Sequence, residues 1–123
     1  MQLTEFFEQI GGDYAEILER LGKAERIQKY VLKFSDTDDM RLLEESLQAG
    51  DYAEAFRHSH SLKGMCANLG FTALYGSSSA LCEVLRPYGS HEKEASGIPD
   101  YAALFEAVKK DYVFLIDRIK QLT

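Results

Sequence analysis

A chain of 123 residues is long enough to bury one hydrophobic core, and we expect a single domain over residues 1–123. Hydrophobic residues make up 46% of the sequence, yet no apolar run approaches the roughly 20 residues of a membrane-spanning helix. The formal net charge of −6 argues against a nucleic-acid partner, which would require a basic patch or stripe.

The start of the chain, residues 1–5, lacks the basic stretch and apolar run of a secretory signal. We therefore expect a cytoplasmic protein without membrane contact. Cys66 and Cys82 have no metal-ligand or redox spacing, so reduced thiols in the core are expected. The start at Met1 and the close at Thr123 favour a free-standing protein, and no extra apolar seam indicates an oligomer, so a monomer is expected.

Helical periodicity runs through nearly the whole chain, and no segment alternates in the manner of a strand. Glycine stops and aspartate N-caps, such as Gly50-Asp51, divide this pattern into segments. In chain order, helices are expected at residues 3–10, 14–21 (with Asp13 as N-cap), 24–34, 40–48, 52–69, 73–85 and 100–122. The third of them should carry one apolar stripe, formed by Ile27, Tyr30, Val31 and Phe34.

Most connections between these segments are short, which favours antiparallel neighbours in a bundle. The longest loop is expected at residues 86–99, polar and mobile, with a solvated His91. The predicted fold class is all-α, an antiparallel four-helix bundle with extra short N-terminal helices.

The segment that carries chemistry is residues 58–70, within the fifth expected helix. Six neighbours share the helix face of His60 at about 100° per residue: Ala53, Phe56, Arg57, Lys63, Gly64 and Ala67. Three apolar residues lie on the opposite side: Leu62, Met65 and Leu69. His60 should therefore project away from the core, whereas His58 should point towards it and have a satisfied hydrogen bond.

A neutral imidazole is a nucleophile near neutral pH, so His60 can attack a phosphoryl group and hold it as a phosphoramidate. Lys63, three residues further on, can offset the negative charge of that group. Gly64 leaves space beside the imidazole, although a glycine inside a helix costs about 1 kcal/mol relative to alanine. Phe56 on the same face would be an apolar anchor for a docking partner.

The run His60-Ser61-Leu62-Lys63-Gly64, with Gly70 six residues further on, resembles the H-x-[apolar]-K-G-x5-G signature of histidine phosphotransfer (HPt) domains. Residues 47–52 are similar to the turn before the active helix of those domains, and residues 68–71 to its end. The resemblance covers about residues 13–122. It departs at Ser59, where the family often has alanine, and in the additional first helix.

The resemblance implies that His60 is the phosphorylated residue, that Lys63 stabilises the phosphoryl group and that Gly64 gives clearance to a docking partner. Phe56, Arg57 and Ala67 would contact that partner. Donor and acceptor would be aspartates on response-regulator receiver domains of a phosphorelay, and a hybrid sensor histidine kinase could carry one of them. The family implies no cofactor of its own, because the receiver binds the Mg²⁺, and no autonomous kinase activity.

Other interpretations of the same residues stay open. His60 and Lys63 can be ordinary surface residues, Phe56 can be tucked between helices, and Arg57 can pair with Glu54 or steer an acidic partner. A second function class is a helical adaptor that binds a signalling partner through this face without phosphorylation.

The sequence lacks the motifs of two further classes, metal-binding bundles and nucleotide-binding enzymes. His58 and His60 diverge on a helix, and the sequence has no Glu-x-x-His pair, so no metal site is expected. It also has no GxxxxGK[ST] phosphate loop and no kinase-type GxGxxG, which argues against nucleotide chemistry.

Overall fold

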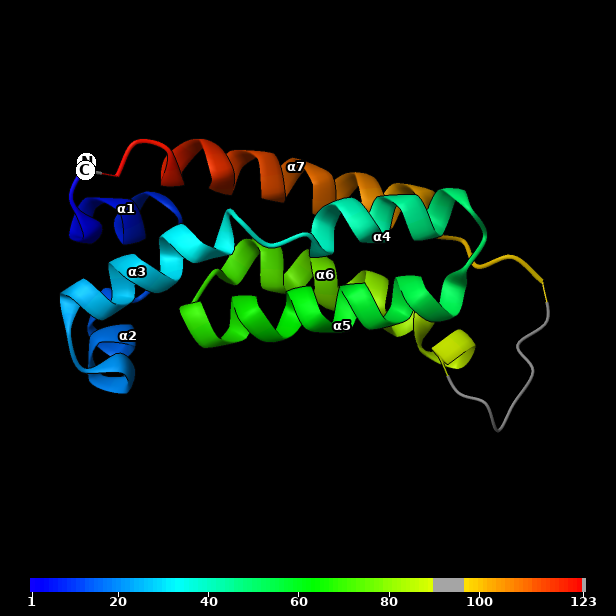
Figure 1. The fold of residues 1–123 in the computed structure, drawn as a ribbon, viewed down its shortest axis with the longest axis horizontal. Helices are drawn as coiled ribbons and strands as arrows, with labels where there is room; N and C mark the ends of the chain where they lie inside the picture. Colours follow the sequence, from blue (N-terminus) through cyan, green and yellow to red (C-terminus); the bar gives the residue numbers. More distant parts are fainter. Residues whose placement is uncertain (90–96, 123) are drawn as a thin grey trace.

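The computed structural model describes residues 1–89 and 97–122 of the chain. Within these ranges the chain forms seven α-helices and no strand (Figure 1). In order they are α1 (Leu3–Gln9), α2 (Tyr14–Leu21), α3 (Ala24–Phe34), α4 (Asp39–Gln48), α5 (Tyr52–Leu69), α6 (Thr72–Leu85) and α7 (Ala102–Ile119). A short 3-10 helix, η1 (Arg86–Gly89), follows α6.

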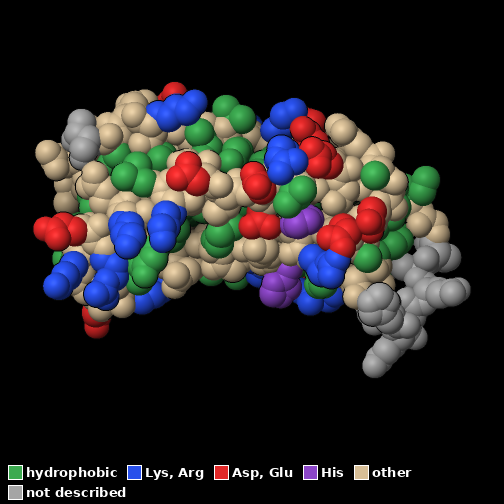
Figure 2. All heavy atoms as spheres, in the orientation of Figure 1, with side chains coloured by type: hydrophobic (Ala, Val, Ile, Leu, Met, Phe, Trp, Pro, Cys, Tyr) green, Lys and Arg blue, Asp and Glu red, His purple; other side chains and the backbone are tan. Residues whose placement is uncertain are grey.

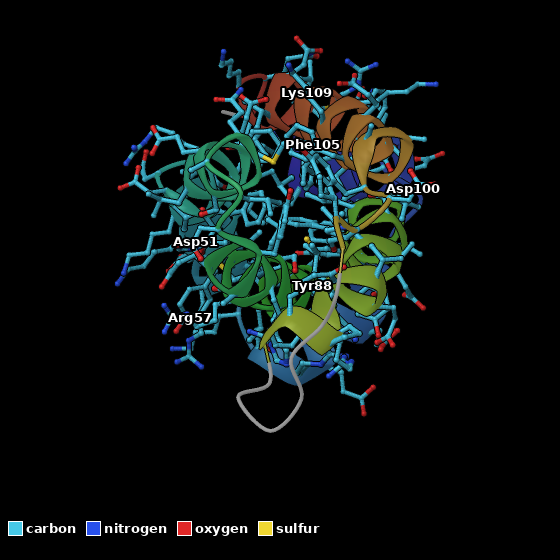
Figure 3. The ribbon with its side chains drawn as sticks, turned by 90° about the vertical axis from the view of Figure 1, so that its right-hand side faces the viewer. Asp51, Arg57, Tyr88, Asp100, Phe105 and Lys109 are labelled. Atoms are coloured by element: carbon cyan, nitrogen blue, oxygen red, sulfur yellow. The ribbon has the colours of Figure 1, made fainter. Side chains whose placement is uncertain are left out.

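Helices α4, α5, α6 and α7 form a four-helix bundle in which successive helices run in opposite directions (Figure 1). Helix α5 packs against both α4 and α6, and α6 packs against α7. An ion pair between Lys109 of α7 and Glu44 of α4, at 3.6 Å, joins the remaining two helices. Viewed from the end, Phe105 points into the space between the four helices (Figure 3). The predicted all-α antiparallel four-helix bundle is confirmed.

Capping residues set the two ends of α5 and the start of α2, as the sequence indicates. The Asp13 carboxylate accepts a hydrogen bond from the Glu16 backbone N–H, and Asp51 accepts one from the Glu54 N–H, each at 3.2 Å. Gly70 ends α5 with φ of 73°, a left-handed conformation that favours glycine.

Several expected boundaries are off by one to three residues. Helix α1 ends one residue early, α4 and α6 each begin one residue early, and α7 is shorter than residues 100–122 at both ends. At the start of α7, Tyr101 is the N-cap residue; its ring packs near Tyr52 and its hydroxyl donates to the Leu47 carbonyl at 3.4 Å. At the other end, the N–H of Leu122 bonds the Ile119 carbonyl at 3.1 Å, a tighter turn that ends the α-helix.

Three of the four residues in the predicted apolar stripe of α3 are buried, and Tyr30 is the exception. Ile27, Val31 and Phe34 are buried, but Tyr30 is 40% exposed. The apolar stripe of a helix is narrow, and Tyr30 lies at its edge, where an aromatic ring with a hydroxyl can meet water.

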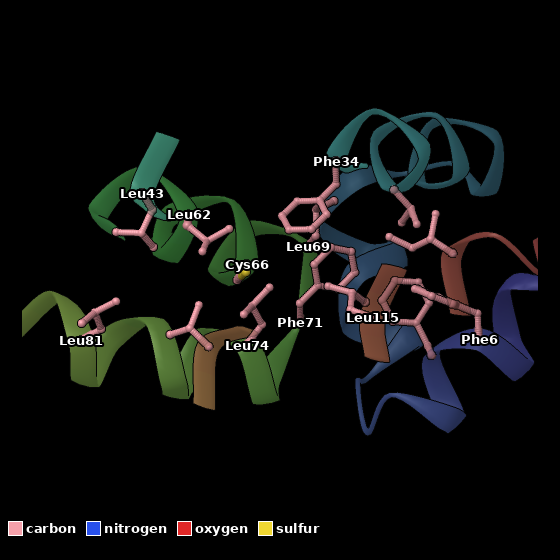
Figure 4. Close-up of a cluster of buried hydrophobic side chains, with 14 of the residues drawn as sticks. Phe6, Phe34, Leu43, Leu62, Cys66, Leu69, Phe71, Leu74, Leu81 and Leu115 are labelled. Carbon is pink, nitrogen blue, oxygen red and sulfur yellow. The ribbon is translucent and has the colours of Figure 1, made fainter. Parts of the chain in front are cut away.

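The N-terminal helices pack against the end of the bundle at which α5 ends and α6 begins (Figure 1). Phe6 of α1 is fully buried, and its ring meets Phe71 edge-on at 6.2 Å. Phe71 in turn contacts Phe34 of α3 at 5.1 Å. Figure 4 shows this aromatic group beside the leucines between α4, α5 and α6. The buried side chains of α1 and α3 therefore share one core with the bundle. Burial of each phenylalanine stabilises this core by about 1.5–3 kcal/mol.

The long loop is described only in part. Its first residues, Arg86–Gly89, form η1. Residues 90–96, on which the predictions of a mobile loop and a solvated His91 fall, lie outside the described residues. Across residues 1–89 and 97–122, none of the helices combines the length and apolar character that crossing a bilayer demands.

Candidate functional site

His60 lies midway along α5 with its side chain exposed. The residues on the other side of the helix, Leu62, Cys66 and Leu69, are buried in the core. Met65 is half-buried at the edge of that core. Figure 2 shows both described histidines on the molecular surface, beside basic and acidic side chains. The predicted orientation of His60, away from the bundle, is confirmed.

An aromatic ring flanks the His60 imidazole. The Phe56 ring meets it edge-on, with 5.8 Å between ring centroids and 72° between the ring planes. Phe56 is half-buried, so it is neither free on the surface nor tucked fully between helices. The Arg86 guanidinium lies 5.4 Å from its ring centroid, and Gly89 of η1 approaches the ring so closely that a Cβ there would overlap it. Phe56 therefore lies between the two interpretations that the sequence left open, and η1 holds its ring in place.

Lys63 lies one turn along α5 from His60, and α6 helps to hold it. Its ammonium is 6.0 Å from the centroid of the Tyr75 ring, at the outer limit of a cation–π contact. Its charge also lowers the pKa of Glu83, after the larger effect of the hydrogen bond and charge of Arg86. Lys63 is therefore a half-buried cation with neighbours on a second helix, not a freely solvated one.

Gly64 and Ala67 form a low, exposed strip next to His60. A Cβ added at Gly64 would meet no atom within 4 Å. Packing inside the protein therefore does not require glycine here, and the missing side chain leaves open space beside His60. Arg57, on the other side of His60, is exposed and pairs with Glu54, which was one of the two interpretations left open for it. Figure 3 shows Arg57 directed away from the bundle.

His58 has a different environment from His60. Its Nδ1 lies 3.1 Å from Asp39 Oδ1 at the start of α4, and its Nε2 lies 3.6 Å from Glu54 Oε2. The other oxygen of Asp39 accepts a hydrogen bond from the Ser61 hydroxyl at 3.1 Å. The predicted satisfied hydrogen bond of His58 is confirmed. This network ties α4 to α5 through the two positions that flank the His60 turn.

Metal ligation finds no support in the part of the chain that the structure describes. Within residues 1–89 and 97–122, no group of three or more His, Cys, Asp or Glu side chains is arranged to hold a metal ion. Both cysteines are buried free thiols, and burial raises the pKa of Cys66 to about 12.

Ser59, the departure from the alanine that the resembled family often has, causes no unsatisfied polar group. Its side chain is fully buried, and its hydroxyl donates to the Phe56 carbonyl at 2.8 Å. Because that hydrogen bond stays within α5, serine fits the position without a partner from another helix.

Helix α2 borders the same face of α5 at its C-terminal end. The Arg20 guanidinium donates to the carbonyls of Ala67 and Asn68, at 3.1 and 2.9 Å, and pairs with Glu16 at 2.9 Å. These carbonyls belong to the last turn of α5, which has no helical donors left for them. A surface groove begins there, lined by Glu16, Cys66, Ala67, Gly70, Thr72 and Tyr75.

Sequence reasoning did not find three residues that complete the surroundings of His60: Tyr75, Arg86 and Gly89. All three lie in α6 or η1. Helical spacing identifies neighbours on one helix only, and the contact between two helices depends on how they pack. No sequence signal for them was available.

The comparisons with known proteins agree with the geometry. A family model described as Hpt domain matches residues 31–121, which include α4 to α7 and the whole of the His60 face. Helices α1 and α2 lie before the matched segment. Neither the search of curated proteins nor that of solved structures found a protein that matches this chain.

Proposed function

We propose, on the premise that this chain belongs to the Hpt domain family, that it accepts a phosphoryl group on His60 and passes it on in a two-component phosphorelay. The observation that carries the proposal is the exposed His60 imidazole, with Lys63 one turn away and open space at Gly64. Members of this family are phosphotransfer carriers. For this chain we add that His60 carries the phosphoryl group, that Lys63 and Gly64 assist, and that receiver domains are the partners.

The transfer step balances as a displacement at phosphorus. The donor is an acyl phosphate on an aspartate of a receiver domain. The unprotonated nitrogen of the His60 imidazole forms a bond to phosphorus, and the bond between phosphorus and the aspartate oxygen breaks. The carboxylate leaves with the electron pair, and the proton on the other imidazole nitrogen can pass to water. The reverse step, onto a second receiver aspartate, completes the relay.

Lys63 and Gly64 have separate parts in this step. The transferring group spreads negative charge over its outer oxygens, and the Lys63 ammonium is close enough to His60 to offset part of it. Gly64 has no side chain to block the approach of a receiver along α5. Phe56, Arg57 and Ala67 would contact the docked receiver, with Phe56 as the apolar member of that surface.

The receiver would also supply the metal. A Mg²⁺ ion held by acidic receiver residues would offset negative charge on the phosphoryl group. The protein itself would have no kinase activity and would act as a monomer. Its donor could be the receiver domain of a hybrid sensor histidine kinase.

The test is transfer from a radiolabelled phosphorylated receiver domain, with Mg²⁺, to three proteins: wild type, His60→Gln and His58→Gln. We expect label on wild type and on His58→Gln in an acid-labile, base-stable form, and none on His60→Gln. The fold of His60→Gln should be intact, since a surface polar substitution changes stability by no more than about 0.5 kcal/mol.

Two outcomes would contradict the proposal. Label retained by His60→Gln would remove the assignment of His60. No label on wild type from any of several receivers would favour the helical adaptor that binds without phosphorylation.

A further inference from the structure

One carboxylate, Glu83 of α6, pairs with Arg86, the cation that lies over the Phe56 ring beside His60. Arg86 Nη2 and Nε lie 2.8 and 3.3 Å from the same oxygen, Glu83 Oε1. The same guanidinium lies over the Phe56 ring at 5.4 Å, and that ring meets the His60 imidazole at 5.8 Å. Lys63, whose charge lowers the pKa of Glu83, is the second cation.

We propose that Glu83 is a resident counter-anion, which holds Arg86 in the unphosphorylated protein and competes with the phosphoryl group on His60 for it. The inference deepens the proposed function and rests on it. Glu83 does not touch the reacting atoms and acts through Arg86, so it is a positioning residue.

The competition follows from charge and geometry. A phosphoryl group on His60 brings about two negative charges and several acceptor oxygens to a face that already carries the Glu83 carboxylate. An arginine fork binds phosphate oxygens in the same two-point manner as it binds a carboxylate. Arg86 can direct its full set of N–H donors to only one anion at a time. Each donor that contacts Glu83 is therefore lost to the phosphoryl group.

The Phe56 ring gives Arg86 a surface along which to move. A guanidinium stacks on an aromatic face at little energetic cost and keeps its donors free at the edge. Because the Arg86 guanidinium and the His60 imidazole both contact this ring, the guanidinium can leave Glu83 for an anion on His60 and stay stacked on the ring. The same path lets Arg86 return to Glu83 when the phosphoryl group leaves.

The functional consequence is a weaker hold on the phosphoryl group. A carrier must release what it accepts, and Arg86 without a counter-anion would favour the phosphorylated state. Glu83 opposes this effect. Both Glu83 and Arg86 are well exposed, with side-chain exposures of 61% and 48%, so solvent and salt screen the effect and it should be modest.

The experiment uses phosphoramidate, a small anionic donor that needs no docking partner. The unprotonated imidazole nitrogen of His60 forms a bond to phosphorus as the bond between phosphorus and the protonated donor nitrogen breaks. Ammonia leaves with the electron pair of that bond, and the proton on the other imidazole nitrogen passes to water. Glu83→Gln removes the charge and keeps the shape of the side chain. Glu45→Gln is the matched control, because Glu45 pairs with Arg41 on α4 at 3.1 Å with similar exposure.

We expect Glu83→Gln to be phosphorylated on His60 about two- to fivefold faster than wild type at low salt. The phosphohistidine should also decay more slowly by a similar factor. Both differences should shrink in about 1 M salt, which screens charges beyond roughly 3 Å, whereas a structural change would not follow salt in this way. Glu45→Gln should behave as wild type. In an Arg86→Gln background, the Glu83→Gln substitution should have a smaller effect.

Rates in Glu83→Gln that equal those of Glu45→Gln, or that fall below wild type, would overturn the inference and leave the proposed function standing. A failure of every receiver to transfer to wild type, with normal labelling by phosphoramidate, would overturn the proposed function alone. No phosphoramidate labelling of His60 in any variant would overturn the inference, because Arg86 would then assist no incoming phosphoryl group.

Discussion

The ring of Phe56 lies edge-on to the imidazole of His60, one helical turn away on α5. Its position is set from outside that helix, since Gly89 of η1 packs against one part of the ring and Arg86 lies over its face. The exposed histidine therefore has an ordered side, towards Phe56, and an open side, towards Gly64.

The contact between Gly89 and Phe56 leads to the first prediction. In Gly89→Ala, the new methyl group would overlap the Phe56 ring, so ring and η1 must shift. We expect the free energy of unfolding to fall by about 1–3 kcal/mol, as for overpacked cores, measured by urea denaturation. The NMR signals of the His60 imidazole should move as well, because the neighbouring ring moves. Unchanged stability and unchanged His60 signals would show that the contact is not maintained in solution.

The open side of His60 leads to the second prediction, for which the chain offers a matched control. Gly64 and Gly76 both lie inside helices, and a Cβ at either would meet nothing within 4 Å. Glutamine at either position should therefore raise the free energy of unfolding, by roughly 0.5 kcal/mol, through better helix propensity. Only Gly64→Gln should slow transfer from a receiver domain, because its side chain lies beside His60. Equal transfer rates in the two variants would remove the clearance role of Gly64.

Lys63 leads to the third prediction. We expect Lys63→Ala to slow phosphoryl transfer roughly tenfold, in line with the loss of one charge-assisted contact, and to shorten the lifetime of the phosphohistidine. Stability should change little, and Lys109→Ala, which removes an exposed lysine on α7, should leave transfer unaffected. A transfer rate and an adduct lifetime equal to those of wild type would exclude Lys63 from the mechanism.

The buried thiols lead to the fourth prediction. Burial raises the pKa of Cys66 to about 12, so the thiol keeps its proton at pH 8 and the reactive thiolate is almost absent. Cys82 is fully buried as well. We expect neither thiol to react readily with iodoacetamide at pH 8 in the folded protein, and both to react in urea. Rapid alkylation of the native protein would mean that the core near these residues opens easily.

Much of this protein could be predicted from local sequence patterns. Asp13, Asp51 and Gly70 mark helix ends through hydrogen bonds and a backbone conformation that involve only residues nearby in the chain. The orientation of His60 follows from helical periodicity, because the apolar residues Leu62 and Leu69 turn the other side of α5 to the core. The helices, their order and the exposed histidine with its same-helix neighbours were determined by the sequence itself.

Only the tertiary structure decided which residues of other helices surround His60. Tyr75, Arg86 and Gly89 reach this face because α6 and η1 pack beside α5, and the rotation of one helix against another depends on the fit of all side chains between them. The same holds for Asp39, which links His58 to Ser61 from the start of α4. Local hydrogen bonds and periodicity act over a few residues, whereas these contacts join positions that only the packed core brings together.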